Sequence, residues 1–152
     1  MCRSWFTVVL LTLFVASCSR TSPSPDVASL ERKLGDADPA ARARAARDLA
    51  KHGEAAAVAL SALIDSLRHA DVDVRQSAAV AIGKIGPAAG DAIPALTLAL
   101  GDAEWPVRRA AVQALGEIGD PAALPAVRAA ISDRDSLVRK AAGDSVKRLS
   151  AK

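Results

Sequence analysis

Few residues in this chain have the types and spacing that catalysis requires. The sequence has two cysteines, Cys2 and Cys18, and two histidines, His52 and His69. No group of cysteine, histidine and acidic residues has the spacing of a metal site, and no serine follows the pattern of a hydrolase nucleophile. We therefore expect a protein that is not an enzyme and that has neither a metal nor a cofactor.

Cys18 is the one residue for which the sequence predicts a covalent modification. Arg3 precedes an apolar stretch at residues 5–16, an order typical of an export signal. As a helix this stretch would be about 18 Å long, too short for a hydrocarbon core of about 30 Å. Residues 15–18 (VASC) resemble the bacterial lipobox, which implies that Cys18 becomes a lipidated N-terminus. An ordinary signal peptide with a chance cysteine is the alternative.

This interpretation divides the chain into three parts. Residues 1–17 are a signal peptide, 18–25 a lipidated cysteine with a polar, proline-containing tether, and 26–150 the folded domain. Several acyl chains hold a protein at a membrane more firmly than one does, so we expect a lipid-anchored protein of the bacterial cell envelope. The resemblance also implies, from Ser19, the outer membrane facing the periplasm rather than the inner membrane.

Arginine recurs at nearly fixed intervals and marks internal repeats. Arg42, Arg75, Arg108 and Arg139 are 33, 33 and 31 residues apart, in similar phrases such as VRQSAAVAIGKIG and VRRAAVQALGEIG. A period of this size predicts a stacked array of two-helix units, four in all. In the third unit we expect an outer helix over 88–100 and an inner helix over 105–118, ended by Gly119.

The positions that follow each arginine predict how the inner helices pack. Positions 3, 7 and 10 after it lie on one helical face, which makes them a buried stripe. They carry Ala45, Ala78, Ala111 and Ala142, then Leu49, Ile82, Leu115 and Val146, then His52, Ile85, Ile118 and Leu149. We interpret His52 as a partly buried structural residue. A small residue at position 8 admits the next helix, whereas Lys147 at the last such position predicts that nothing stacks there.

An Asp-x5-Arg pattern accompanies three of the arginines, as Asp36/Arg42, Asp102/Arg108 and Asp133/Arg139. With this pattern the chain resembles HEAT repeats, especially the HEAT-like repeats first named from phycobilisome lyases. The resemblance implies an all-α fold, a short α-solenoid of about four two-helix repeats, with these residues as a ladder of pairs between repeats. His69 replaces the aspartate before Arg75, so we expect a weaker or pH-sensitive rung there, with Asp71 as a substitute partner.

The inner helices also carry an excess of positive charge away from the buried stripe. Seven cations stand against Asp48, Glu117 and Asp144; they are Arg44, Arg47, Lys51, Lys84, Arg109, Lys140 and Arg148. The pattern predicts either a solvated face without a partner or a mildly basic groove for an acidic protein segment or an anionic envelope polymer. The whole chain has a net charge of only +3, too small to indicate nucleic acid.

Two functions follow from these features. The first is a non-catalytic, membrane-tethered scaffold for protein–protein interaction. The second, which only the family resemblance suggests, is a lyase-like enzyme or enzyme accessory that acts on a chromophore or a partner protein. Trp105 is open to two interpretations: an interface anchor, or a residue that packs the turn before Pro106.

Overall fold

The computed structural model describes residues 25–151 of the chain. Cys18, the predicted signal peptide and nearly all of the predicted tether lie outside the described residues, so the lipidation of Cys18 stays a prediction. Within the described residues no helix combines the length and the apolar character needed to cross a membrane.

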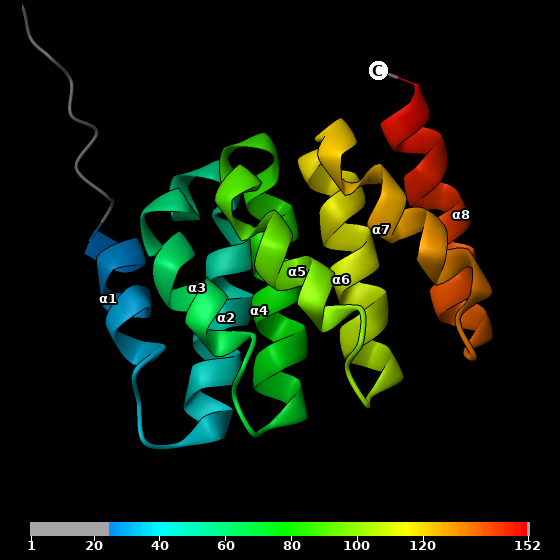
Figure 1. Ribbon diagram of the computed structural model, residues 1–152. Helices are drawn as coiled ribbons and strands as arrows, with labels where there is room; N and C mark the ends of the chain where they lie inside the picture. Colours follow the sequence, from blue (N-terminus) through cyan, green and yellow to red (C-terminus); the bar gives the residue numbers. More distant parts are fainter. Residues whose placement is uncertain (1–24, 152) are drawn as a thin grey trace, which may run out of the picture.

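The described residues form two layers of α-helices joined by short turns, with no strand among them (Figure 1). The outer layer consists of α1 (Pro25–Lys33), α3 (Leu60–Ser66), α5 (Ile93–Ala99) and α7 (Leu124–Ala129). The inner layer consists of α2 (Pro39–Lys51), α4 (Val72–Ile85), α6 (Trp105–Ile118) and α8 (Ser136–Ser150). Each outer helix and the inner helix after it make one repeat. This confirms the all-α class and the short α-solenoid.

Local sequence signals set where the inner helices begin and end. The carboxylates of Asp38, Asp71 and Asp135 accept backbone N–H bonds at the starts of α2, α4 and α8. Gly119 ends α6 with φ 73° and ψ 19°, a left-handed conformation that glycine adopts without steric cost. The inner helices are therefore long and regular.

The outer helices are shorter than the sequence predicts. Where one helix was expected over 88–100, the chain forms a 3-10 segment (Gly86–Ala92) followed by α5. Pro94 is one reason, because it has no N–H to donate to the fourth carbonyl before it and so cannot continue a helix from upstream. The other 3-10 segments are Gly53–Ala59, Pro121–Ala123 and Ala130–Ser132.

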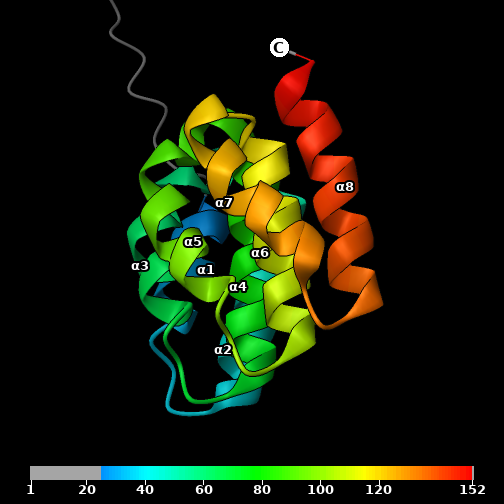
Figure 2. The same cartoon turned by 45° about the vertical axis from the view of Figure 1, so that its right-hand side comes forward.

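The core lies between the two layers and along the row of inner helices. Neighbouring inner helices make the most extensive contacts in the fold, and they stand side by side in both views (Figures 1 and 2). The stripe residues Leu49, Ile82 and Leu115 are fully buried. His52 after the first inner helix and Val146 in the last inner helix are the two stripe residues that are only half-buried.

Two glycines set how closely the inner helices approach one another. A Cβ atom on Gly83 would lie 2.9 Å from the Cα of Ala114, and one on Gly116 would lie 2.7 Å from the Cβ of Ser145. Ser145 occupies the space beside Gly116 and donates from Oγ to the Val112 carbonyl at 3.1 Å. Lys147, at the equivalent position of α8, is exposed.

We predict that Gly116→Ala destabilises the protein by about 2 kcal/mol, because the added methyl group overlaps Ser145 in a close-packed interface. Chemical denaturation followed by circular dichroism measures the change. Gly143→Ala is the matched control: a Cβ atom there meets nothing within 4 Å, and alanine should stabilise α8 by about 0.5–1 kcal/mol. Equal effects of the two substitutions would contradict the close-approach explanation.

Candidate functional site

An arginine near the start of an inner helix reaches the aspartate of the following repeat. Arg75 donates from Nε and Nη2 to the two carboxylate oxygens of Asp102, at 2.7 and 3.1 Å. Arg108 makes the same two bonds to Asp133, at 2.8 and 3.0 Å. The side chains of this second pair expose only 5% and 11% of their surface. A two-bond pair fixes both distance and orientation, so it fixes how one repeat sits on the next.

The same guanidinium groups also donate hydrogen bonds to the turn that precedes their own inner helix. Arg75 donates from Nη1 to the carbonyl oxygens of His69 and Ala70, at 2.8 Å each. Arg108 and Arg139 make equivalent bonds to the turns that precede α6 and α8. Because Arg139 lies in the last described repeat, it fastens its turn but pairs with no aspartate of a following repeat.

His69 interrupts this series of pairs, and it does so opposite Arg42. Arg75 and Arg108 pair forward along the chain, so in the same register the aspartate missing at position 69 is the one that Arg42 would bind. Asp71 is not a substitute partner of Arg75: its carboxylate caps α4 by accepting from the Val74 N–H at 3.1 Å. The weak rung therefore belongs to Arg42.

His69 still preserves the turn in which it lies. Its Nδ1 accepts the N–H of Asp71 at 3.0 Å. The carboxylates of Asp36 and Asp102 accept the N–H two residues further along, each at 2.9 Å. His69 thus replaces the acceptor role of aspartate but not its charge. A protonated Nδ1 could not accept this bond.

The pairs change the acidity of their members. The hydrogen bond from Arg108 holds the pKa of Asp133 below its ordinary value, against the opposing effect of burial. For Asp102, burial alone would raise the pKa, but the bonds from Arg75 and from the Glu104 N–H outweigh it and the pKa is lowered. Both carboxylates are therefore held in the charged form.

The seven predicted surface cations lie on all four inner helices, and all but the half-buried Arg109 are exposed. Four of them have partners. Lys51 pairs with Asp48 at 2.6 Å and Lys84 with Glu117 at 3.0 Å. Arg47 donates to Ser77 at 3.2 Å, and the Arg109 guanidinium lies 5.6 Å from the centre of the Trp105 ring. The other three, Arg44, Lys140 and Arg148, have no hydrogen-bond or ion-pair partner among residues 25–151. We call these seven side chains and their immediate neighbours the inner-helix face.

The inner-helix face contains a shallow cavity of about 220 Å³ between α4, α6 and α8. Lys84, Glu117 and Arg148 line it together with Val80, Ala110 and Gln113. Lys84 and Arg148 thus line the same cavity as the Glu117 carboxylate, which pairs with Lys84. Arg44, Arg47 and Lys51 are all on α2, at the other end of the array.

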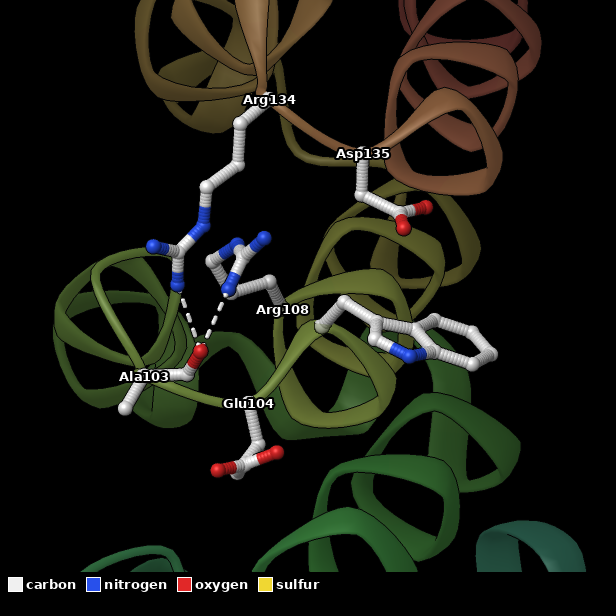
Figure 3. Close-up of a pocket in the computed structure, with 6 residues that line it drawn as sticks. Ala103, Glu104, Arg108, Arg134 and Asp135 are labelled. Carbon is white, nitrogen blue, oxygen red and sulfur yellow. Dashed lines mark hydrogen bonds between the residues drawn. The ribbon is translucent and has the colours of Figure 1, made fainter.

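A second cavity, of about 320 Å³, lies at the turns before α6 and α8 (Figure 3). The Ala103 carbonyl oxygen accepts bonds from Arg108 at 3.0 Å and from Arg134 at 2.6 Å, which bridges two neighbouring turns. Trp105 also lines the cavity and is 40% exposed, so it is neither a fully packed turn residue nor a fully exposed anchor.

Sequence reasoning missed the bridging role of Arg134. A signal was present: the equivalent positions of the first three turns are Ala37, Ala70 and Ala103, and only the fourth turn carries a charged residue there. An arginine at a position that is otherwise alanine can make a hydrogen bond that the alanines of the other turns cannot make. Among the described residues, no group of three or more histidine, cysteine and acidic side chains could hold a metal ion.

Together, the stacked helix pairs and the arginine–aspartate ladder define a helical repeat protein. The sequence model of the family described as HEAT repeats matches residues 27–97 and 60–147. The chain belongs to the HEAT-repeat family. No curated protein matches it at a significant level.

Solved structures with the same fold include a designed protein, a lyase complex and a hydroxylase. A designed armadillo repeat protein in complex with the peptide (KR)4 is 24% identical, with a TM-score of 0.69 over 81% of this chain and 64% of that one. The complex of CpcE and CpcF of phycocyanin lyase from a Nostoc species is 22% identical, with a TM-score of 0.63 over 88% and 68%. Human deoxyhypusine hydroxylase is 28% identical, with a TM-score of 0.67 over 86% and 46%. The chain therefore spans less than two thirds of the designed protein and less than half of the hydroxylase.

We predict that Asp133→Asn destabilises the protein by about 3 kcal/mol, because it leaves the buried Arg108 guanidinium without a counter-charge. Urea denaturation gives the change in the free energy of unfolding. Asp36→Asn is the matched control, because an amide oxygen can still accept the turn N–H and no arginine pairs with Asp36; its effect should stay below about 0.5 kcal/mol. A small effect at both positions would mean that the pair is dispensable.

The pH dependence of this difference provides a further prediction. Asp133 has a lowered pKa in the folded state, so its charge stabilises the fold above the unfolded-state value of about 3.9. That contribution is lost as the pH falls through the native pKa. The stability gap between wild type and Asp133→Asn, measured by urea denaturation, should thus be complete at neutral pH and shrink below about pH 4. A gap independent of pH down to acid would exclude the carboxylate charge as its source.

Proposed function

We propose that this protein is a non-catalytic scaffold that binds an acidic segment of another protein on its inner-helix face. The observation that carries the proposal is the set of cations on the inner helices: six exposed ones on α2, α4 and α8 and the half-buried Arg109 on α6. Three of the exposed cations, Arg44, Lys140 and Arg148, have no partner among the described residues. A protein that stacks helices in this way offers one continuous surface rather than an enclosed pocket. An extended or helical segment with carboxylates along one side is the ligand that such a surface fits.

The mixed character of the face favours a protein segment over a uniform anionic polymer. Asp48, Glu117 and Asp144 lie among the cations, and each would repel a chain that is negative at every position. The cavity beside Arg148 also includes the aliphatic Val80, which can contact an apolar side chain of a protein segment. The designed armadillo repeat protein is an analogy only for peptide binding on stacked helices, because its peptide, (KR)4, is basic and not acidic.

The proposal includes a tether at the bacterial envelope through a lipid on Cys18. It rests on the lipobox-like sequence at residues 15–18, the short apolar stretch before it and the polar segment after it. An anchor of two or three acyl chains would keep the scaffold at the membrane surface. Mass spectrometry of the membrane-extracted protein tests this part directly, by the mass of the lipidated N-terminal peptide and its loss in Cys18→Ser.

We propose a non-catalytic protein because its two histidines lie apart. His52 follows the C-terminal end of α2, whereas His69 lies in the turn before the N-terminal end of α4. We therefore place the protein with the binding members of its fold rather than with the enzymes.

We predict that the triple variant R44E/K140E/R148E loses at least about tenfold in affinity for a fluorescein-labelled peptide of alternating Glu and Ala, measured by fluorescence anisotropy. Added salt should weaken the wild-type complex, because the cations involved are solvent-exposed. The matched control is K33E/R68E/R128E, which makes the same change in net charge at exposed positions outside the inner-helix face.

The control variant should bind the acidic peptide nearly as well as wild type does. If both triple variants weaken binding equally, net charge and not the inner-helix face is responsible. If heparin binds and the acidic peptide does not, the partner is an anionic polymer and the protein-segment proposal is wrong. Circular dichroism checks that each variant keeps its helices.

A further inference from the structure

The first arginine of the ladder is the only one with a following described repeat but no aspartate opposite it. Arg42 donates from Nε to the Asp36 carbonyl, which fastens its own turn. Its Nη1 and Nη2 groups have no partner among the described residues. Neither is a buried unsatisfied atom, so both are open to solvent. A guanidinium with two free, accessible NH₂ groups can bind a carboxylate through two bonds.

A cavity lies beside this free guanidinium. It has a volume of about 240 Å³ and lies between the end of α1, the start of α2, helix α3 and the turn before α4. Arg42, Asp65 and His69 are its titratable groups, and Leu34 and Ala62 contribute apolar surface. It is separate from the inner-helix face, since the side chains of that face do not line it.

The same chain contains an equivalent site in which the aspartate is present. The corresponding cavity between the third and fourth repeats is lined by Leu100, Ala126 and Asp133. There the Asp133 carboxylate is held by Arg108 through two bonds. The first junction thus has an arginine and a cavity at the equivalent positions, but it has His69 in place of Asp133 and Asp65 in place of Ala129.

We propose that the cavity between the first two repeats is a carboxylate-binding site, in which a carboxylate from outside the chain binds Arg42 where the later repeats supply an aspartate. A free small carboxylate and the acidic side chain of a protein share this chemistry. Asp65 opposes binding, because its own carboxylate lines the cavity and forms no ion pair with Arg42. Bound carboxylate and Arg42 would complete the first rung.

The test is an NMR titration of the full chain in a non-ionic detergent with sodium acetate, at ionic strength held constant with sodium chloride. The Arg42 side-chain N–H signals should shift in a saturable way. The N–H signals of Arg75 and Arg108 are internal controls and should stay in place, because these groups already hold carboxylates. No saturable shift at Arg42, or equal shifts at all three arginines, would overturn the proposal.

Two substitutions of His69 distinguish the effect of an added carboxylate charge from the effect of the hydrogen bond within the turn. His69→Asp supplies the missing carboxylate within the chain, so it should raise the melting temperature and weaken acetate binding at Arg42 at least about tenfold. His69→Asn is the matched control: its amide oxygen can still accept the Asp71 N–H, but it brings no charge, so acetate should still bind. Undiminished acetate binding in His69→Asp would contradict the proposal.

A third substitution and a second ligand complete the design. Asp65→Asn removes the opposing charge and should tighten acetate binding, whereas weaker binding would show that the anion is not held beside Arg42. Blocked aspartate, N-acetyl-aspartate amide, then tests the source of the carboxylate. Binding tighter than acetate favours an acidic side chain of a protein, and equal binding favours a free small carboxylate. Failure of both ligands to bind overturns the site but leaves the inner-helix face untouched.

Discussion

The forward pairing of arginine with the aspartate of the next repeat is the interaction on which the rest of the array depends. One guanidinium has five N–H donors in a fixed plane, so Arg75 can bind its own turn through Nη1 and the next repeat through Nε and Nη2 at the same time. Lysine, with a single ammonium group, could not maintain both geometries. The same side chain therefore closes a repeat and sets its orientation relative to the following one, which explains why arginine recurs with the period of the repeat.

The repeat in which an arginine lies, and not only the sequence around it, determines which hydrogen bonds it makes. Arg75 and Arg108 have both partners. Arg139, in the last described repeat, keeps the turn and has no aspartate ahead of it. Arg42 has a following repeat but meets His69 instead of an aspartate. The array is thus asymmetric: its middle and late junctions are joined by largely buried ion pairs, and its first junction contains an open cavity beside the unpaired Arg42 guanidinium. This asymmetry, rather than any catalytic constellation, distinguishes the two ends of the molecule chemically.

The sequence predicted the features that depend on local periodicity. The repeat spacing follows from the recurring arginine phrases, and the end of α6 follows from Gly119. The buried stripe through Leu49, Ile82 and Leu115 follows from the 3.6-residue period of a helix. The small residues Gly83 and Gly116 recur at one position of that helix. It did not predict the direction of the ladder, because Asp-x5-Arg within one repeat does not say that the arginine bonds to an aspartate 25 to 27 residues ahead. The sequence did not predict the ion pair of Lys84 with Glu117 either, because these residues also lie in different repeats. Residues that are far apart in the sequence come into contact when the repeats stack. Only the three-dimensional structure therefore shows which cations of the inner-helix face have no partner.

The most direct measurement of the central claim is a double-mutant cycle on Arg75 and Asp102, with Arg75→Met, Asp102→Asn and the double variant compared by urea denaturation. The cycle removes the separate contribution of Arg75 to its own turn and isolates the bond between repeats. We predict a coupling energy of at least about 1 kcal/mol, because the pair is bidentate and mostly buried. A coupling energy near zero, with the two single losses simply adding, would contradict the claim that this pair holds neighbouring repeats together.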